Sequence, residues 1–498
     1  MRLLPRAISR ARRAFLGGTA ATVGLLALRR LGRAAAQPSA VTDSAELKRV
    51  EAAIPAKAFV APRKPRRLLI FDLNVGYGGH GSIATANTAF TLMGARTGAF
   101  ETVVSRDPTV FESESLKQFD AVFFNNTVGN CFEDPALRRN LVEFVYAGGG
   151  LMGVHGTSVA FTKWPGAIED WPEFGIMIGA RGANHRANDE HVFIKLDDPT
   201  HPVNQVFGGQ GFDYRDEFFR VHEPYSRNRV RVLLSIDTEK TDLQQGPGYG
   251  KLERADNDFA LAWVRSYGRG RVFYCTIAHN PYVFWDPRML QFYLAATQFA
   301  MGDLPAPTTP SAKLTPAIRA QEQLGWRLSL VPSLPQESTL FETIDKAAAP
   351  GLLYVGGNSL QKISQDIPRG FNHELSRDDM RQIRLKLDAA GVRLLTYHVD
   401  RMPSDDTGRR RVVQFARRMG VEAVVTPQGN LAMEGEPPQI VRLDEPARDN
   451  RIDPLLDEAH RQRRTPIIFC VESASDRRIQ SIEAFNNAII QLAKRGMP

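Results

Sequence analysis

The feature that most constrains the fold is an alternation of short apolar runs with stretches of helical periodicity, which begins near Arg67. Strand-like runs lie at residues 68–73, 101–105, 120–125 and 151–155, and helix-like stretches lie between them at 84–94 and 135–146. Further strands are predicted at 192–196, 230–236, 260–264 and 271–277, with a closing helix at 287–301. Strands that alternate with helices favour parallel βαβ units with helices on both faces of one sheet. We therefore predict an α/β fold.

A second alternation follows a proline-rich stretch at residues 305–324. Its predicted strands lie at 326–331, 352–355, 392–398, 423–426 and 467–472. The helix between the second and third of these strands has clear ends, because Ser376 and Asp379 form a capping-box pattern and Gly391 is a typical helix stop. This alternation predicts a second α/β unit.

The length of the chain also favours more than one domain, since 498 residues exceed what one ordinary core accommodates. We expect a leader at residues 1–37, a connector at 38–65 with one short helix near 45–53, and a first domain at 66–304. The proline-rich stretch 305–324 is predicted to be a linker, and residues 325–498 form the second domain.

The basic charge of the chain is concentrated in the leader. The formal net charge is +8, and residues 1–37 contain eight arginines and no acidic residue, so the rest of the chain is close to neutral. The charge of the chain outside the leader therefore gives no support for a nucleic-acid partner. Three cysteines far apart in sequence (Cys131, Cys275 and Cys470) provide neither a disulfide framework nor a CxxC motif.

The leader has the pattern of a twin-arginine export signal. Arg12 and Arg13 precede an apolar run at residues 14–28, and three alanines at 34–36 resemble a cleavage site. The apolar run is shorter than the roughly 20 residues that a membrane-spanning helix needs, so we expect no stable membrane span. These observations predict export to a bacterial periplasm, with a disordered basic arm as the alternative.

The run 148–158 provides the strongest candidate for a site. Three glycines and a short apolar strand lead to His155, which lies where the strand ends. In an open α/β sheet, ligands bind beyond the carboxyl ends of the strands. A strand followed by a sharp turn between small residues is also how nucleophile elbows expose a side chain, although an imidazole suits metal binding or proton transfer better than lasting acyl transfer.

Other chemistry-bearing residues are expected at the same edge of the first sheet. Several imidazoles with a carboxylate are typical of a site for a divalent metal such as Zn, Mn, Fe or Ni. The predicted ligands are His80, His155, His185, Glu217 and His279. The candidates for acid–base or electrostatic catalysis are His155, Glu217 and Asp216. Of the two carboxylates, one could be the ligand or base and the other could hold it in position.

Two patterns around these residues have alternative interpretations. Residues 76–81 match GxGxxG between a strand and a helix, which indicates either nucleotide binding or a loop that presents His80. Asn126 could hydrogen-bond a sugar or cap a turn. Aromatic residues near these loops could stack on a sugar or anchor the core. They are Trp164, Trp171, Phe174, Tyr282 and Trp285. The candidate substrate-binding residues among them are Trp171 and Trp285.

Several of these motifs, in this order, resemble the ThuA-like or trehalose-utilisation family over about residues 66–304. They are the glycine-rich loop with His80, the runs 120–127 (DAVFFNNT), 153–155 (GVH) and 216–219 (DEFF), and the run 270–274 (GRVFY) that leads to 279–281 (HNP). The resemblance implies a flavodoxin-like, doubly wound sheet as in class I glutamine amidotransferases, with His155 where the nucleophilic cysteine stands. It also implies a carbohydrate substrate.

Residues 325–498 resemble sugar phosphate isomerases/epimerases of the xylose-isomerase-like TIM-barrel type. The resemblance rests on the runs 326–328 (WRL), 371–376 (FNHELS) and 468–472 (IFCVE), in which Glu472 corresponds to a last-strand glutamate. Only about five βα units are found where a full barrel has eight, so an incomplete barrel is expected.

Together these observations predict an exported, metal-assisted hydrolase or isomerase that acts on a disaccharide or keto-glycoside. Two alternatives remain open: a non-catalytic sugar-binding or assembly module, and a nucleotide-dependent sugar oxidoreductase that uses the glycine loop. The metal, the sugar and the oligomeric state are left open, with a homo-oligomer among the alternatives.

Overall fold

The structure of the protein is a computed structural model, which describes residues 39–243, 254, 256–333, 335, 336, 338–443, 454, 456, 459, 467–472 and 478–495. The predicted leader lies outside these residues. Among the residues described, no helix is both long and apolar enough to cross a membrane.

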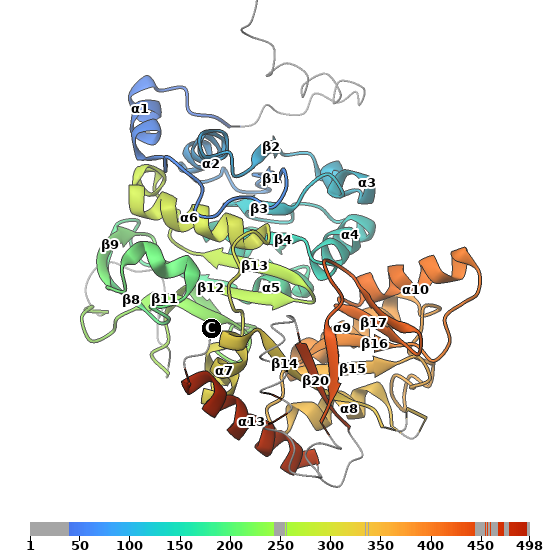
Figure 1. Ribbon diagram of the computed structural model, residues 1–498. Helices are drawn as coiled ribbons and strands as arrows, with labels where there is room; N and C mark the ends of the chain where they lie inside the picture. The colour runs from blue at the N-terminus through green and yellow to red at the C-terminus, as the bar shows by residue number, and fades with distance from the viewer. Residues whose placement is uncertain are drawn as a thin grey trace, which may run out of the picture. The chain divides into compact units, whose positions relative to one another are not determined.

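The first sheet has nine strands in the order β2-β1-β3-β4-β13-β12-β11-β8-β9 (Figure 1). Its parallel half consists of β1 (Arg67–Phe71), β2 (Glu101–Ser105), β3 (Ala121–Asn125), β4 (Gly150–Val154) and β13 (Gly270–Cys275). Its antiparallel half consists of β12 (Ala260–Tyr267), β11 (Arg231–Ile236), β8 (Glu190–Leu196) and β9 (Phe212–Asp216). The predicted α/β class is confirmed, and the sheet is mixed rather than wholly parallel.

Helices cover both faces of this sheet, as the alternation predicts. Successive residues of a strand point to opposite faces, so Ile70 packs in one hydrophobic core with Phe90 of α2 (Ile83–Thr97), whereas Phe71 packs in another. Of the other helices, α1 (Ser44–Ala53) and α6 (Pro287–Ala300) contribute to the first core, and α4 (Pro135–Tyr146) and α5 (Pro172–Ile178) contribute to the second. The strands are thereby fixed from both sides, and the carboxyl ends of the parallel strands β1, β2, β3, β4 and β13 share one edge.

The second sheet is curled and mostly parallel, with seven strands in the order β18-β17-β16-β15-β14-β20-β19. The strands are β14 (Trp326–Val331), β15 (Tyr354–Asn358), β16 (Arg393–His398), β17 (Ala423–Thr426), β18 (Gly429–Ala432), β19 (Gln439–Arg442) and β20 (Ile467–Glu472). Among the strands that the structure describes in this sheet, only β18 is antiparallel to its neighbour. The expectation of an incomplete barrel is therefore confirmed.

The helices that accompany the second sheet include, among the described residues, α7 (Pro316–Leu324), α8 (Leu340–Ala348), α9 (Arg377–Ala390), α10 (Asp406–Arg418) and α13 (Arg478–Lys494). The ends predicted for α9 are confirmed, because Ser376 and Asp379 form the capping box and Gly391 ends the helix with φ +61°. Residues 305–324 do not form an extended linker throughout. Pro316 begins α7, since proline is well tolerated in the first turn of a helix. Ile318 of this helix is buried.

Candidate metal centre

His155 lies on a sharp turn at the carboxyl end of β4, as the sequence predicts. Its φ is +41°, a conformation that residues with a side chain seldom adopt, and it begins a 3-10 helix (His155–Val159). A Cβ at Gly156 would lie 2.9 Å from Cε1 of His80. The small residue beside His155 therefore leaves room for the ring of His80.

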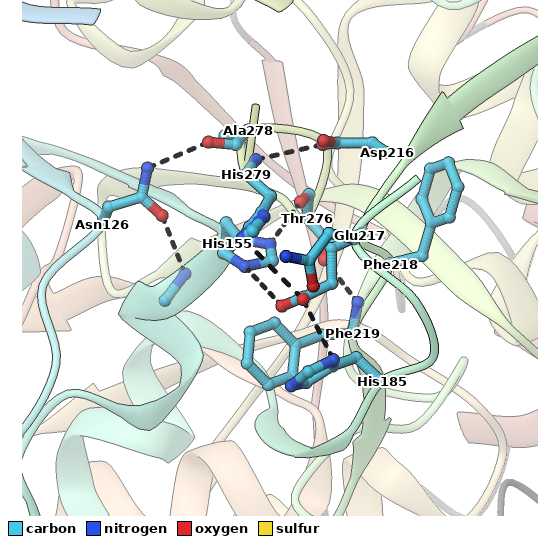
Figure 2. A network of polar contacts seen from close by, with 12 residues as sticks. Asn126, His155, His185, Asp216, Glu217, Phe218, Phe219, Thr276, Ala278 and His279 are labelled. Atoms are coloured by element: carbon cyan, nitrogen blue, oxygen red, sulfur yellow. Dashed lines mark hydrogen bonds and ion pairs between the residues drawn. The ribbon is translucent and has the colours of Figure 1, made fainter. Parts of the chain in front are cut away.

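Four side chains from distant parts of the chain converge at this turn. His80 precedes α2, His155 follows β4, Glu217 follows β9 and His279 lies beyond β13. One ligand atom from each lies within 4.8 Å of the other three. Figure 2 shows His155, His279 and Glu217 pointing toward a common point. This is the one such group of His, Cys, Asp or Glu side chains found among the residues that the structure describes.

Hydrogen bonding leaves the ring nitrogens of this cluster available. Nδ1 of His155 lies 2.9 Å from the carbonyl oxygen of Thr276, and because only a protonated nitrogen can donate to a carbonyl, Nε2 of the neutral ring carries a lone pair. That Nε2 is buried without a hydrogen-bond partner, as are Nδ1 of His80 and Nδ1 of His279. Buried polar atoms without partners are uncommon and indicate a missing proton, water or ion.

The electrostatics favour a cation among these atoms. Burial, with help from the neighbouring histidines, lowers the pKa of His80 to about 2 and that of His279 to about 4, so both rings are neutral at pH 7. Burial alone would raise the pKa of Glu217, but the neighbouring imidazoles of His155 and His185 hold it well below its usual range. Neutral imidazoles around an anionic carboxylate are the donor set of Zn, Mn, Fe or Ni sites. Oε1 of Glu217 lies 3.3 Å from Nε2 of His155.

His185 lies outside the group of four and acts on Glu217. Its Nδ1 is 3.1 Å from Oε2 of Glu217 and 2.8 Å from the carbonyl oxygen of Arg186. Burial lowers the pKa of His185, but the hydrogen bonds to Glu217 and to the carbonyl oxygen of Arg186, together with the charge of Glu217, outweigh it, and the net pKa is raised. The structure thus places this predicted ligand where it orients the carboxylate of Glu217.

Asp216 holds the backbone that presents His279. Its carboxylate accepts hydrogen bonds of 3.0 Å from the backbone N–H groups of both His279 and Asn280, and one of 2.7 Å from the side chain of Asn280. Burial raises its pKa to about 7, against the opposing effect of these donors. Of the two neighbouring carboxylates, Glu217 faces the cluster and Asp216 supports it.

Two of the predicted substrate-binding residues, Asn126 and Trp171, are buried. Asn126 is fully buried, and its amide donates to the carbonyl oxygen of Ala278 and to Oγ of Ser82 while its oxygen accepts from N–H of Gly156. Trp171 is 8% exposed and packs edge-on against Phe161. Both side chains are therefore buried among other residues of the domain. Trp285 is half-buried beneath the guanidinium of Arg49.

Thr276 is a functional residue that the sequence analysis did not identify. It lies directly after β13, whose Cys275 is in register with Val154 of β4, so its carbonyl reaches the ring of His155. Its hydroxyl also accepts a hydrogen bond of 2.9 Å from N–H of Phe219, beside Glu217. Its position one residue beyond the strand neighbouring β4 is the signal that could have revealed it.

The fold and the site together define a class: an α/β domain with a buried cluster of three histidines and a glutamate at the carboxyl edge of its sheet. Residues 67–300 match the family model ThuA, described as trehalose utilisation. This part of the chain is therefore a ThuA domain. No curated protein matches the chain.

Solved structures add structural neighbours of low similarity. A ThuA-like protein from Bacteroides uniformis is 20% identical with a TM-score of 0.39, and the match covers 48% of this chain and 92% of that one. A ThuA-like protein from Parabacteroides merdae is 18% identical with a TM-score of 0.35, covering 49% and 93%. A β-galactosidase from Bacillus circulans is 11% identical with a TM-score of 0.30, covering 52% and 33%.

Proposed function

We propose that the ThuA domain is a metal-assisted enzyme that hydrolyses or isomerises a disaccharide or a keto-glycoside. The observation that carries the proposal is the group of three imidazoles, each with one buried and unpartnered ring nitrogen, that gathers with the anionic Glu217. The family description, trehalose utilisation, supports a carbohydrate substrate.

His80, His155, His279 and Glu217 would hold the metal, and their chemistry fits a divalent transition metal better than Ca²⁺ or Mg²⁺, which prefer oxygen ligands. When bound, such an ion supplies a Lewis acid that polarises a carbonyl or hydroxyl oxygen. The chain itself keeps the imidazoles neutral by burial and orients Glu217 through His185. Thr276 fixes the tautomer of His155.

The test is turnover of trehalose and of keto-glycosides by the purified protein, before and after chelation and after addition of Zn²⁺, Mn²⁺, Fe²⁺ or Ni²⁺. We expect turnover that disappears on chelation and returns with one of these metals. Sugar binding that persists without metal and without turnover would instead favour a binding module. Reduction of a nicotinamide cofactor would favour an oxidoreductase that uses residues 76–81.

We also propose that the protein is exported by the twin-arginine route, from the pattern at residues 12–36. Replacement of Arg12 and Arg13 by lysine should retain the full-length protein in the cytoplasm of a bacterial host. Equal periplasmic amounts of both forms in cell fractionation would contradict export by this route.

A further inference from the structure

An exposed aromatic and apolar patch lies beside the metal centre. The described residues include six large hydrophobic side chains that are exposed, and three of them (Val75, Trp164 and Ile168) belong to two loops near His80. These loops touch each other, since a Cβ at Gly76 would lie 3.4 Å from the carbonyl oxygen of Trp164. Exposed apolar patches on soluble proteins commonly mark binding surfaces.

Ring contacts connect this patch to the proposed ligands. The ring of Trp164 lies 5.3 Å from that of Tyr77, and the ring of Tyr77 lies 5.1 Å from that of His80. His80 in turn lies 4.8 Å from His155. The side chains of Trp164 and Tyr77, whose rings meet edge-on, therefore form an aromatic surface that leads from the outside of the molecule toward the cluster.

The two loops rest on a small apolar cluster that also adjoins the centre. Val128, Val159 and Phe219 are buried, and Tyr77 and Ala167 pack against them. The ring of Phe219 lies 4.7 Å from that of His155 and 5.3 Å from that of His185, and Figure 2 shows it beside both. This packing fixes the aromatic surface relative to the ligands.

Trp164 lies at the tip of a short hairpin, formed by β5 (Thr162–Lys163) and β6 (Ile168–Glu169). Its side chain is 38% exposed, whereas Trp171, which follows the hairpin, is 8% exposed. The hairpin thus leaves the indole of Trp164 at the surface, whereas the indole of Trp171 after it lies in the core.

We propose that Trp164 and Tyr77 form a stacking platform for a pyranose ring of the substrate, next to the metal centre. Carbon-bound hydrogens of a sugar ring pack on the flat face of an indole or phenol, and the hydroxyl groups around that ring remain free for polar contacts. The ring contacts of Trp164 with Tyr77 and of Tyr77 with His80 lead from solvent to the candidate metal centre. A disaccharide suits this arrangement, with one sugar unit on the platform and the other at the metal centre. The identity of the occupant as a sugar rests on the proposed function.

The experiment is saturation-transfer NMR and calorimetric titration of the full-length protein with trehalose, sucrose and maltose, on the wild type, Trp164→Ala and Trp164→Phe. Leu360→Ala removes an exposed apolar side chain elsewhere and serves as the control. We expect at least one of the sugars to bind, with transfer to protons on one ring face. Trp164→Ala should weaken that binding about three- to tenfold, Trp164→Phe should restore most of it, and Leu360→Ala should leave it unchanged.

Metal content and thermal unfolding are measured on the same samples, and neither should change in Trp164→Ala. Binding that Trp164→Ala does not alter, or no binding of any of the three sugars to the wild type, would overturn the platform. A wild type that binds sugar through Trp164 but takes up no metal would instead overturn the proposed metal-assisted function and leave the platform standing. The two failures are therefore distinguishable.

Discussion

The two sheets of the molecule both end in polar side chains, but they use them differently. In the second sheet, Nε2 of His398 lies 2.9 Å from Oγ1 of Thr396, and Glu472 accepts a hydrogen bond of 2.6 Å from Arg442. In the first sheet, ring nitrogens of His80, His155 and His279 are buried without partners. Position at a sheet edge is therefore common to both, whereas a group of unpartnered imidazole nitrogens beside a carboxylate distinguishes the candidate site among the described residues.

Strand order explains this difference. β4, which leads to His155, and β13, which leads to His279, are neighbours in the first sheet. The ring centroids of the two histidines lie 5.1 Å apart. In the second sheet, β15 and β14 separate β16, which ends at His398, from β20, which ends at Glu472. Side chains at the ends of adjacent parallel strands meet readily, which accounts for the pairing of His155 with His279. Strand adjacency does not account for Glu217, which follows the edge strand β9.

The largest expected effect is that of Glu217→Gln, which removes the only anionic member of the cluster. We expect metal affinity to fall more than about 100-fold, because loss of a ligand should exceed the 10- to 100-fold cost of losing a supporting residue. Glu472→Gln makes the same change at the edge of the second sheet and should have no effect. Competition with a metal-binding dye measures both, and equal affinities for the two variants would remove the distinction between the sheets.

Asp216→Asn should have the next largest effect. The amide has one oxygen where the carboxylate has two, so it cannot accept from both His279 and Asn280, and its NH₂ group would face one of their N–H donors. We expect metal affinity to fall about 10- to 100-fold. Asp213→Asn, at an exposed position on the same strand, is the matched control. An Asp216→Asn variant that binds metal as tightly as the wild type would show that His279 needs no such support.

Gly156→Ala should have a smaller effect. The added methyl group would lie 2.9 Å from Cε1 of His80 and 3.0 Å from Cγ2 of Val128, so the His80 ring must move away from the cluster. We expect metal affinity to fall about tenfold. Gly81→Ala is a close control, since a Cβ there meets nothing within 4 Å. If both variants bind metal alike, His80 does not depend on this close approach.

Local signals in the sequence predict much of the fold. The capping residues and the stop of α9 are visible as Ser376, Asp379 and Gly391, because helix ends are determined by nearby residues. The sequence does not predict β9, because buried Phe212 and Tyr214 alternate with exposed Asp213 and Arg215 over only five residues, so the run as a whole is polar. Mixed strand directions follow from long-range pairing, which periodicity does not contain.

The sequence predicts the candidate site in part. Placement at strand ends selects His80, His155, His279 and Glu217, which the structure brings together. It does not separate Glu217 from Asp216, nor Trp164 from Trp171, because neighbouring residues on one loop can face the site or the core. Only the tertiary fold decides which carboxylate faces the rings and which indole is buried.

The most direct test of the metal centre is elemental analysis of the full-length protein after incubation with Zn²⁺, Mn²⁺, Fe²⁺ or Ni²⁺ and removal of free metal, on the wild type, His155→Ala and His398→Ala. We predict about one bound ion per chain in the wild type and in His398→Ala, and little or none in His155→Ala. No bound metal in the wild type, or the same amount in His155→Ala, would contradict the account.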